Sequence, residues 1–402
     1  MRILVVGAGG VGGAVAAIAA RRGFVEHLVL ADYDPDRARA VVDRLGDPRL
    51  VAARVDAADQ AGVEELIAAH RVDALLCATD PRFVMPLFRA CLAAKVTYLD
   101  MAMSMSVPHP ERPYEECGVK LGDEQFALHD DLVDAGVLAV VGIGVEPGLS
   151  DVFARYAADH LFSRIDELGV RDGANLVVPG RPFAPAFSIW TLIEECLNPP
   201  VVWERGRGWF TTAPFSEPEV FDFPAGIGPL ECVNVEHEEV LLMPRWVQAR
   251  RVTFKYGLGS TVISTLRTLH ELGLAATEPV RVRDVWVSPR EVVAACLPDP
   301  ATIGAEMTGV TCAGLWVTGT GVDGAPREVY LHHVVDNAWS MAEYGSQAVV
   351  WQTAVNPVVA LELIASGVWS GAGVLGPEAF DAVPFLALLT EYGSPWGLRE
   401  GG

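Results

Sequence analysis

The chain has 402 residues, of which 51% are hydrophobic and 20% are charged. This balance excludes an intrinsically disordered chain, and the length allows two domains with a core each. The formal net charge is −22 and no lysine- or arginine-rich cluster is present, so we expect no nucleic-acid partner. We find no apolar run long enough to span a bilayer and no signal peptide, and therefore predict no membrane partner and a cytoplasmic location.

The seven cysteines form no Cys-x-x-Cys pair and lie in no histidine-rich segment. Structural zinc sites need closely spaced cysteine and histidine ligands. We therefore expect reduced, mostly buried thiols and no metal.

The first thirteen residues carry the clearest motif in the chain. Ile3–Val6 is an apolar, β-branched run typical of a buried parallel strand, and Gly7, Gly9 and Gly12 lead from it into the helix-forming stretch Ala14–Ala20. This order of strand, glycine turn and helix is typical of dinucleotide binding, because the helix N-terminus offers free N–H groups to a pyrophosphate. The predicted cofactor-binding residues of this turn are Gly7, Gly9, Gly10, Val11 and Gly12.

The second predicted strand, His27–Ala31, ends at Asp32. An acid there can accept hydrogen bonds from both hydroxyls of the adenosine ribose and repels a 2′-phosphate, so we expect NAD as the cofactor. NADP stays open, because Arg37 and Arg39 follow and could bind a phosphate, unless both are exposed on the next helix. A Rossmann-like domain that binds no dinucleotide is the alternative.

Strands and helices alternate over the first 150 residues, which predicts a Rossmann-type, doubly wound parallel sheet. Ligands bind at the carboxyl ends of such strands, which adds Asp56, Ala57, Ala78 and Thr79 to the predicted cofactor site. The further strands are expected at Leu50–Val55, Ala74–Ala78, Val96–Asp100 and Leu138–Ile143, with helices at Pro35–Ala40, Gln60–His70 and Val84–Ala94.

The pattern changes from about Asp166, where runs of alternating polarity are separated by connectors rich in proline and glycine. We expect a second, α+β domain there with a mixed or antiparallel sheet, followed by a helix over Thr353–Ala365 and by a loop and helix over Gly371–Phe385. The predicted strands are Leu168–Arg171, Val220–Phe223, Glu231–Val235, Arg251–Tyr256, Leu315–Thr318 and Glu328–Val335.

Several short motifs in order resemble the saccharopine dehydrogenase and lysine dehydrogenase superfamily. They cover nearly the whole chain and are individually loose. The stretches are Tyr98–Ala102, Glu146–Gly148, Phe187-Ser188, Asn198–Pro200, Gly206-Arg207, Phe223–Glu231, Phe254–Gly257, Gln352-Thr353 and Gly373–Glu378.

The resemblance implies an NAD(P)-dependent oxidoreductase of amino-acid metabolism, such as lysine metabolism, that acts on a C–N bond of an amino acid or polyamine. It also implies a C-terminal segment that returns to the Rossmann domain, which makes the second domain an insertion, and a homodimer. The predicted boundaries are 1–150 for the dinucleotide-binding domain, 151–340 for the substrate domain and 341–402 for the C-terminal helical segment.

One departure from the family concerns the stretch after Phe187-Ser188. Saccharopine reductases carry an arginine there for a substrate carboxylate, whereas this chain has no arginine and two acids, Glu194 and Glu195. The departure argues against saccharopine and favours an amine, and only one of two adjacent acids on a helix can face a cleft. The predicted substrate-binding residues are Tyr98, Met101, Ser188, Glu195, Asn198 and Thr353.

Amine oxidation needs a group that removes a proton from nitrogen, and we expect one acid for binding and a separate base. The catalytic candidates are Glu146, in a turn at a strand end; Asp100, at another strand end; and His333, in an apolar run where His332 must face the other side. Lys255 is a further possible base, because a family lysine stands in the same short motif, whereas His237 is expected in an exposed loop.

Two other functions stay open. One is an NADPH-dependent reductive condensation of an amine with an aldehyde acid, as in carboxynorspermidine-forming relatives. The other is a Rossmann protein that senses a dinucleotide without hydride transfer.

Overall fold

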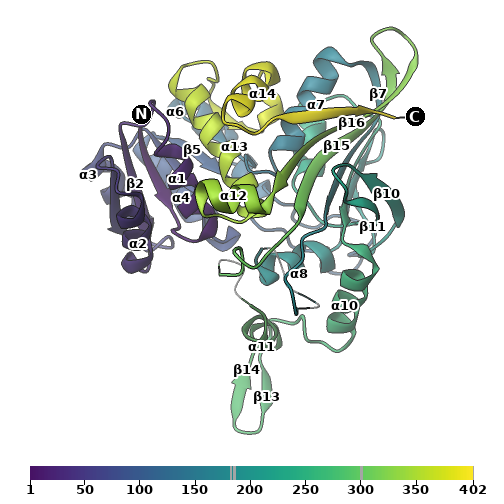
Figure 1. Ribbon diagram of the computed structural model, residues 1–402, viewed down its shortest axis with the longest axis horizontal. Coiled ribbons are helices and arrows are strands. Elements are labelled where there is room, and N and C mark those ends of the chain that lie inside the picture. The colour runs from purple at the N-terminus through teal and green to yellow at the C-terminus, as the bar shows by residue number, and fades with distance from the viewer. Residues whose placement is uncertain (182, 184–186, 299–301, 402) are drawn as a thin grey trace.

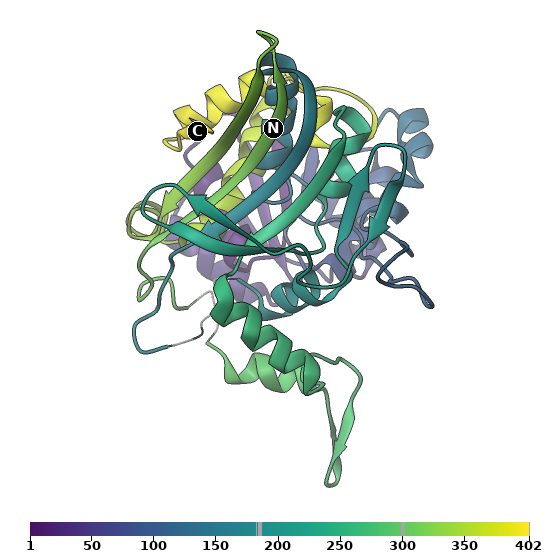
Figure 2. The ribbon, with the colours of Figure 1, turned by 90° about the vertical axis from the view of Figure 1, so that its right-hand side faces the viewer.

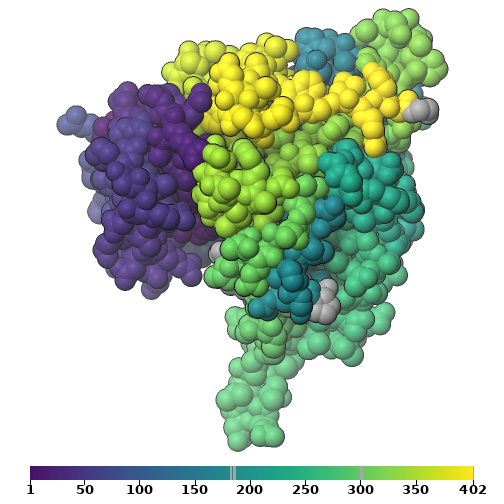
Figure 3. Space-filling model, in the orientation of Figure 1, coloured from purple at the N-terminus to yellow at the C-terminus, as the bar shows by residue number. Residues whose placement is uncertain are grey.

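The computed structural model describes residues 1–181, 183, 187–298 and 302–401. Its N-terminal lobe, purple to blue in Figure 1, lies beside a second lobe coloured teal and green, and the yellow C-terminal segment runs across both. Figure 3 shows the same lobes in contact over this face. One continuous apolar core includes buried residues of both lobes, so the space between them has a defined shape.

The first sheet has seven parallel strands in the order β17-β6-β5-β4-β1-β2-β3. Its inner strands β1 and β4 are almost entirely buried and apolar, as parallel strands covered on both faces must be. The strands are β1 (Arg2–Val6), β2 (His27–Asp32), β3 (Leu50–Arg54), β4 (Ala74–Cys77), β5 (Thr97–Asp100), β6 (Leu138–Val140) and β17 (Gly373–Leu375).

Helices cover the first sheet, and several begin at residues that cap them. Asp34 and Asp59 accept hydrogen bonds from backbone N–H groups at the starts of α2 and α3. The helices of this part are α1 (Gly10–Ala19), α2 (Pro35–Leu45), α3 (Gln60–His70), α4 (Val84–Ala94), α5 (Asp123–Phe126) and α6 (His129–Ala135), whereas α7 (Leu149–His160) packs on the second sheet.

The second sheet is mixed, and Figure 2 shows it in front of the N-terminal lobe. At its centre, β7 pairs in parallel with β12 and antiparallel with β15. Its path runs β10-β11-β12-β7-β15-β16-β18, with β8 on β12 and β9 on β8. The strands are β7 (Phe162–Ala174), β8 (Val201–Glu204), β9 (Gly208–Thr211), β10 (Glu219–Phe223), β11 (Gly228–Asn234), β12 (Arg251–Gly257), β15 (Val310–Gly321), β16 (Pro326–Asp336) and β18 (Trp396–Glu400).

The remaining helices pack around this sheet or project from it. An arm made of α10, the hairpin β13–β14 and α11 extends away from the body of the molecule (Figure 1). The elements are α8 (Ile189–Leu197), α9 (Glu239–Trp246), α10 (Gly259–Glu271), β13 (Val280–Val282), β14 (Val285–Val287), α11 (Pro289–Cys296), α12 (Asn337–Tyr344), α13 (Ala348–Ala365) and α14 (Ala382–Glu391).

The prediction of a Rossmann-type parallel sheet with a second mixed sheet is confirmed. After residue 340, α13 packs on α1 and β17 extends the first sheet, whereas β18 joins the second sheet beside β16. The sixth strand ends at Val140, three residues before the predicted end. The sequence pattern missed the short strands β8, β9, β13, β14, β17 and β18.

We expected no apolar run long enough to span a bilayer, and the length of α13 contradicts this expectation. Among the described residues, α13 has 18 residues and the hydropathy of a membrane span, but 72% of it is buried inside the fold. Its packing on α1 accounts for this composition, because a helix covered on all sides is apolar all round.

Candidate functional site

The glycine turn after β1 is built from close contacts that exclude side chains. Gly7 has a positive φ of 106°, and a Cβ on it would lie 2.2 Å from the carbonyl oxygen of Ala78. A Cβ on Gly12 would lie 1.8 Å from the carbonyl oxygen of Gly7. A Cβ on Gly9, by contrast, would meet no protein atom within 4 Å. The open space beside Gly9, at the N-terminus of α1, fits the pyrophosphate of a dinucleotide.

Asp32 links the end of β2 to this turn. Its Oδ2 accepts a hydrogen bond from the Ala8 N–H over 2.7 Å, and its Oδ1 accepts one from the Asp34 N–H over 2.9 Å. A small pocket beside it is lined by Tyr33, Arg37 and Arg54. Both carboxylate oxygens keep lone pairs for ribose hydroxyls, while two arginines stand next to the place of a 2′-phosphate.

The other predicted cofactor residues divide between this region and a larger cavity. Gly10 is exposed at the first turn of α1, and Asp56 and Ala57 follow β3, where Asp56 accepts a hydrogen bond from the Ala58 N–H. Val11, Ala78 and Thr79 line the cavity itself. The cavity therefore reaches the glycine turn.

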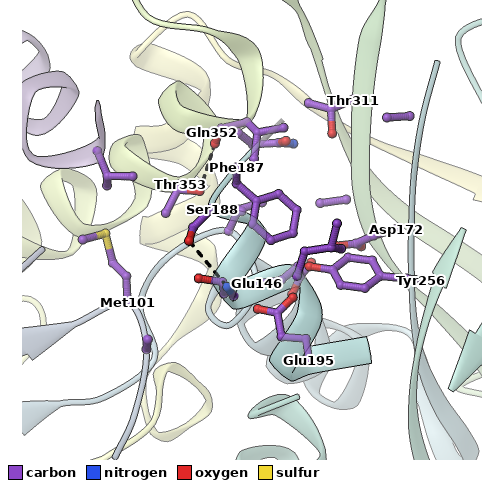
Figure 4. A pocket seen from close by; sticks show the side chains of 18 of the residues that line it. Met101, Glu146, Asp172, Phe187, Ser188, Glu195, Tyr256, Thr311, Gln352 and Thr353 are labelled. Atoms are coloured by element: carbon purple, nitrogen blue, oxygen red, sulfur yellow. Dashed lines mark hydrogen bonds between the residues drawn. The ribbon is translucent and has the colours of Figure 1, made fainter. Parts of the chain in front are cut away.

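The cavity has a volume of about 730 Å³ and lies between the two lobes, in the size range of small-molecule sites. The N-terminal lobe contributes Met101 and Thr79, and the second lobe contributes residues of β7, α8, β12 and β15. In Figure 4, Glu146, Asp172, Glu195 and Tyr256 gather on one side, with Met101 on the opposite side. Of the predicted site residues in the described chain, it takes in Val11, Ala78, Thr79, Met101, Glu146, Ser188, Glu195 and Thr353.

Five acidic residues line this cavity; Asp80 pairs with Arg82 over 2.8 Å, and the other four come from four places in the chain. Glu146 stands in the turn between β6 and α7, Asp172 is near the end of β7, Glu195 is on α8, and Glu238 immediately precedes α9. Ser150 donates a hydrogen bond to Glu146, and the Gly314 N–H donates one to Asp172 over 3.1 Å. No lysine lines the cavity among the described residues.

His237 lies behind these acids and is only 1% exposed, so the expectation that it occupies an exposed loop was wrong. Its ring stacks on Phe254 with centroids 3.9 Å apart. Its Nδ1 donates to Glu239 Oε2 over 2.6 Å and lies 3.3 Å from Glu238 Oε2, and its Nε2 lies 3.8 Å from Glu195 Oε1. In a sequence, an acid-rich run is typical of a solvent-exposed segment. Here packing against Phe254 buries His237.

His237 forms a buried charged pair with Glu239. Burial disfavours the imidazolium, but the carboxylates of Glu239, Glu195 and Glu238 outweigh it and raise the pKa of His237 to about 10. Burial likewise opposes ionisation of Glu239, yet His237 holds the pKa of Glu239 below its ordinary value. Ligand atoms of His237, Glu238 and Glu239 lie within 4.8 Å of one another, as in metal sites. Nδ1 donates to Glu239, however, so the geometry favours an ion pair over a metal.

The cavity carboxyls resist ionisation although the His237 imidazolium lies close to Glu195 and Glu238. Burial raises the pKa of Glu195 to about 8, and burial followed by repulsion from Glu239 raises that of Asp172 well above its usual range. Burial also raises the pKa of Glu146, and repulsion from Asp172 and Glu239 adds to this effect. A bound cation restores the ionised forms, because opposite charge favours them. The site is therefore suited to a positively charged ligand.

Several other predicted residues lie outside the cavity. Asp100 is fully buried and accepts hydrogen bonds from Gln125 and the Gly142 N–H, and burial raises its pKa to about 7. Tyr98 packs edge-on against Phe88. These contacts suit residues that hold β5 in place.

Asn198, His333 and Lys255 are also held away from the cavity. Asn198 donates to Glu236 over 2.8 Å, and Lys255 pairs with Glu219 over 2.6 Å. His333 bonds to Ser394 and Gln352, and burial lowers its pKa to about 3. A histidine that is neutral and enclosed in this way is a poor proton acceptor for a substrate.

The sequence interpretation missed Asp172, Glu238, Glu239 and Tyr256. Asp172 lies near a strand end, and that rule could have nominated it. Tyr256 stands in the Phe254–Gly257 motif, and that resemblance could have nominated it. Glu238 and Glu239 had no local signal, because they belong to an acid-rich run.

Comparisons with known proteins agree with this arrangement. A model of the saccharopine dehydrogenase NADP binding domain matches residues 3–140, and one of the saccharopine dehydrogenase C-terminal domain matches residues 144–394. The chain belongs to the saccharopine dehydrogenase family. A solved structure of saccharopine dehydrogenase (L-Glu forming) from Saccharomyces cerevisiae shares the fold, with a TM-score of 0.69, 13% identity and full coverage of both chains.

Relatives in this family resemble the chain along its whole length. Carboxynorspermidine synthase from Vibrio alginolyticus is 30% identical over 410 residues, which cover 100% of this chain and 97% of that protein. The enzyme of the same name from Vibrio cholerae is 29% identical, with the same coverage. Carboxyaminopropylagmatine dehydrogenase from Synechocystis is 30% identical over 398 residues, covering 98% and 96% of the two chains.

The family settles the class of enzyme. The chain is an NAD(P)-dependent oxidoreductase that acts on a C–N bond, as predicted from the sequence.

Proposed function

We propose that this saccharopine dehydrogenase family member joins an amine to an aldehyde that carries a carboxylate, in an NAD(P)H-dependent reductive condensation. The observation that carries the proposal is the group of four cavity carboxyls at Glu146, Asp172, Glu195 and Glu238, beside a cavity that reaches the glycine turn. The names of the three relatives support it, since they describe carboxyl-bearing derivatives of norspermidine and agmatine.

The acidic side of the cavity fits an alkylammonium or guanidinium substrate. Glu195 on α8 faces the cavity, whereas its neighbour Glu194 forms an ion pair of 2.9 Å with Arg290 of α11. A saccharopine-like substrate brings several carboxylates, and among the described residues that line the cavity only Arg181 offers a cation to pair with them. The charge of the site therefore favours an amine over an amino dicarboxylic acid.

A single guanidinium lines the cavity among its described residues, that of Arg181. Arg181 is exposed, so it lies at the rim, on the connection from β7 to α8. Arginine binds carboxylates through two parallel hydrogen bonds. In the proposed reaction Arg181 receives the carboxylate of the aldehyde at the rim, while the acids hold the amine further in.

The dinucleotide supplies the hydride when it is bound, and the residues of the chain do the rest. Glu195 in its ionised form takes the proton that the incoming ammonium group must lose before its nitrogen attacks the carbonyl carbon. Met101, which follows β5, and Thr353 of α13 bring the reacting carbon toward Val11 and Thr79 at the glycine turn. The second lobe excludes water from the cleft.

Cofactor preference is a separate part of this proposal. Asp32 favours NAD, because its carboxylate is fixed by two backbone N–H groups and repels a 2′-phosphate. Arg37 and Arg54 line the same pocket and would bind that phosphate. We expect Asp32→Ser to weaken NADH binding and strengthen NADPH binding relative to it, as measured by fluorescence titration. A wild-type preference for NADPH would show that the arginines outweigh Asp32.

The proposed function is tested with the full chain, NADH or NADPH, a panel of aliphatic diamines and agmatine-like amines, and an aldehyde bearing a carboxylate. We expect nucleotide oxidation only when amine and aldehyde are both present, and a product with the mass of their sum less water plus two hydrogens. Reduction of NAD⁺ by a free amino acid alone would instead support oxidative deamination. Nucleotide binding without turnover on any pair would support a sensor.

A further inference from the structure

Two carboxyl groups meet in the wall of the cavity with no conventional donor between them. Glu146 lines the cavity, the fully buried Glu239 lies behind it, and their carboxyl groups lie close enough to share a hydrogen bond if one of them carries a proton. Glu146 Oε2 and Glu239 Oε1 have no N–H or O–H partner from another residue. Two carboxyl oxygens in contact away from water require a proton between them, since two bare carboxylates would repel.

The remaining oxygens of the pair show where this proton must be. Glu239 Oε2 already accepts from the His237 imidazolium over 2.6 Å, and Glu146 Oε1 accepts from the Ser150 hydroxyl. Each residue therefore has one oxygen satisfied from outside the pair and one that faces an acid without a donor. A single proton between Glu146 and Glu239 satisfies both.

We propose that Glu146 and Glu239 share one proton, because the fixed positive charge of His237 keeps Glu239 ionised, and that Glu146 delivers this proton to the oxygen that leaves during condensation. The proposal rests on the proposed function. In it Glu146 is the catalytic acid, because it alone of the pair lines the cavity. Glu239 and His237 are positioning residues that act through Glu146.

The proton has a defined use in the chemistry. Attack of the amine on the aldehyde gives a carbinolamine, whose hydroxyl leaves as water only if its oxygen gains a proton. Glu146 donates that proton, the C–O bond breaks, and the nitrogen lone pair forms the C=N bond that accepts the hydride from NAD(P)H. The overall reaction of an ammonium, an aldehyde and NAD(P)H consumes one proton from solvent, and this proton reloads the pair.

The surroundings of Glu146 keep the proton on it at neutral pH. The titratable or polar groups that face it are Ser150 of α7, Asp172 of β7, Glu239 of α9 and Tyr330 of β16. Burial first, then Asp172 and Glu239, raises the pKa of Glu146, while His237 holds Glu239 in its charged form. The acid is thus ready before substrate arrives.

Infrared spectroscopy of the full chain tests the shared proton without turnover. The C=O stretch of a protonated carboxyl is recorded at neutral pH, and the spectrum of the same protein with Glu146→Gln added is subtracted. We expect a protonated-carboxyl band in wild type and its loss in Glu239→Gln. In that variant the amide oxygen must face His237, so its NH₂ group donates to Glu146 and stabilises the ionised form.

Two further variants test whether the loss of the Glu146 band follows from removing any buried group. Glu378→Gln removes an acid that is 1% exposed and pairs with Asp151 instead of Glu146, and the Glu146 band should persist. His237→Gln removes the cation that keeps Glu239 ionised, so the Glu146 band should persist and a second band from Glu239 should appear. Circular dichroism checks that each variant is folded.

Kinetics then connect the proton to the reaction. We expect Glu239→Gln to lower kcat for condensation about tenfold or more with little change in KM for the amine, and to move the basic limb of the pH profile to lower pH. Persistence of the Glu146 band in Glu239→Gln, or its absence in wild type, would overturn the proposal. Failure of the proposed function would look different: no condensation by wild type, with the predicted bands in place.

Discussion

The glycine turn and the acidic side of the cavity contribute to binding in opposite ways. The turn is local, because Gly7, Gly9 and Gly12 stand within six residues. Each glycine matters because a side chain there would occupy space that the backbone or the dinucleotide needs. The acidic side is assembled from β7, α8, α9 and the turn before α7, which lie far apart in the chain. Its residues act by their charge, and that charge depends on how deeply packing buries them.

This contrast predicts which substitutions should change one property and which should change several. A substitution at Gly9 fills space that no protein atom occupies and should affect dinucleotide binding alone. A substitution among the acids changes the ionisation of its neighbours as well, because Glu146, Asp172, Glu195 and Glu239 each alter the pKa of others in the group. The acids should therefore respond to pH in a way that the turn does not.

The largest expected effect is at the turn. Gly9→Val places its Cβ where no protein atom lies within 4 Å, so the fold should persist while NADH binding weakens by at least about a hundredfold, roughly 2.7 kcal/mol. Fluorescence titration measures this, and the melting temperature is the control. Gly12→Ala is the contrasting variant, because its Cβ would clash with Gly7 and should destabilise the fold. Unchanged NADH affinity in Gly9→Val would place the cofactor elsewhere.

A smaller but separable effect is expected at Glu146. Glu146→Gln keeps the size of the side chain and removes its exchangeable acid proton, so kcat/KM should fall at least about tenfold, the lower end for a positioned acid–base group. NADH binding should stay within about twofold. If activity and NADH binding fell together, Glu146 would shape the nicotinamide pocket instead of handling the substrate.

The smallest effect is a pH dependence that only the acidic side should show. Glu195 has a pKa of about 8 in the empty site, so it loses its charge as the pH falls through that value. The affinity for an amine cation should therefore drop about fivefold from pH 8 to pH 7, since the amine itself stays charged over this range. Calorimetry measures the affinity at each pH, and NADH binding serves as the control. An amine affinity that is flat across this range would separate Glu195 from the amine.

The same contrast explains how far the sequence could be interpreted. The glycine turn, Asp32 and the alternation of strands and helices are local patterns, and they predicted the Rossmann sheet. The family was predicted from short motifs that follow one another in order along the chain. Glu146 and Glu195 could be named because one stands in the turn after a predicted strand and the other follows a family motif. His237 and Glu239 could not, because their burial against Phe254 and Glu146 is created by contacts between distant segments. Asp100 and His333 were named by the same local rules, and only packing shows that they face away from the cavity.

The most direct test of the account compares two neighbouring residues on one helix. Glu195 lines the cavity and Glu194 pairs with Arg290 outside it, so Glu195→Gln and Glu194→Gln make the same chemical change one position apart. The measurement is kcat/KM for the amine in the condensation assay, with NADH affinity recorded for both. We predict a loss of about a hundredfold for Glu195→Gln, within the range of a positioned acid–base group, and a change under about twofold for Glu194→Gln. Equal effects of the two variants, or none from Glu195→Gln, would contradict the claim that the cavity carboxyls bind and activate the amine.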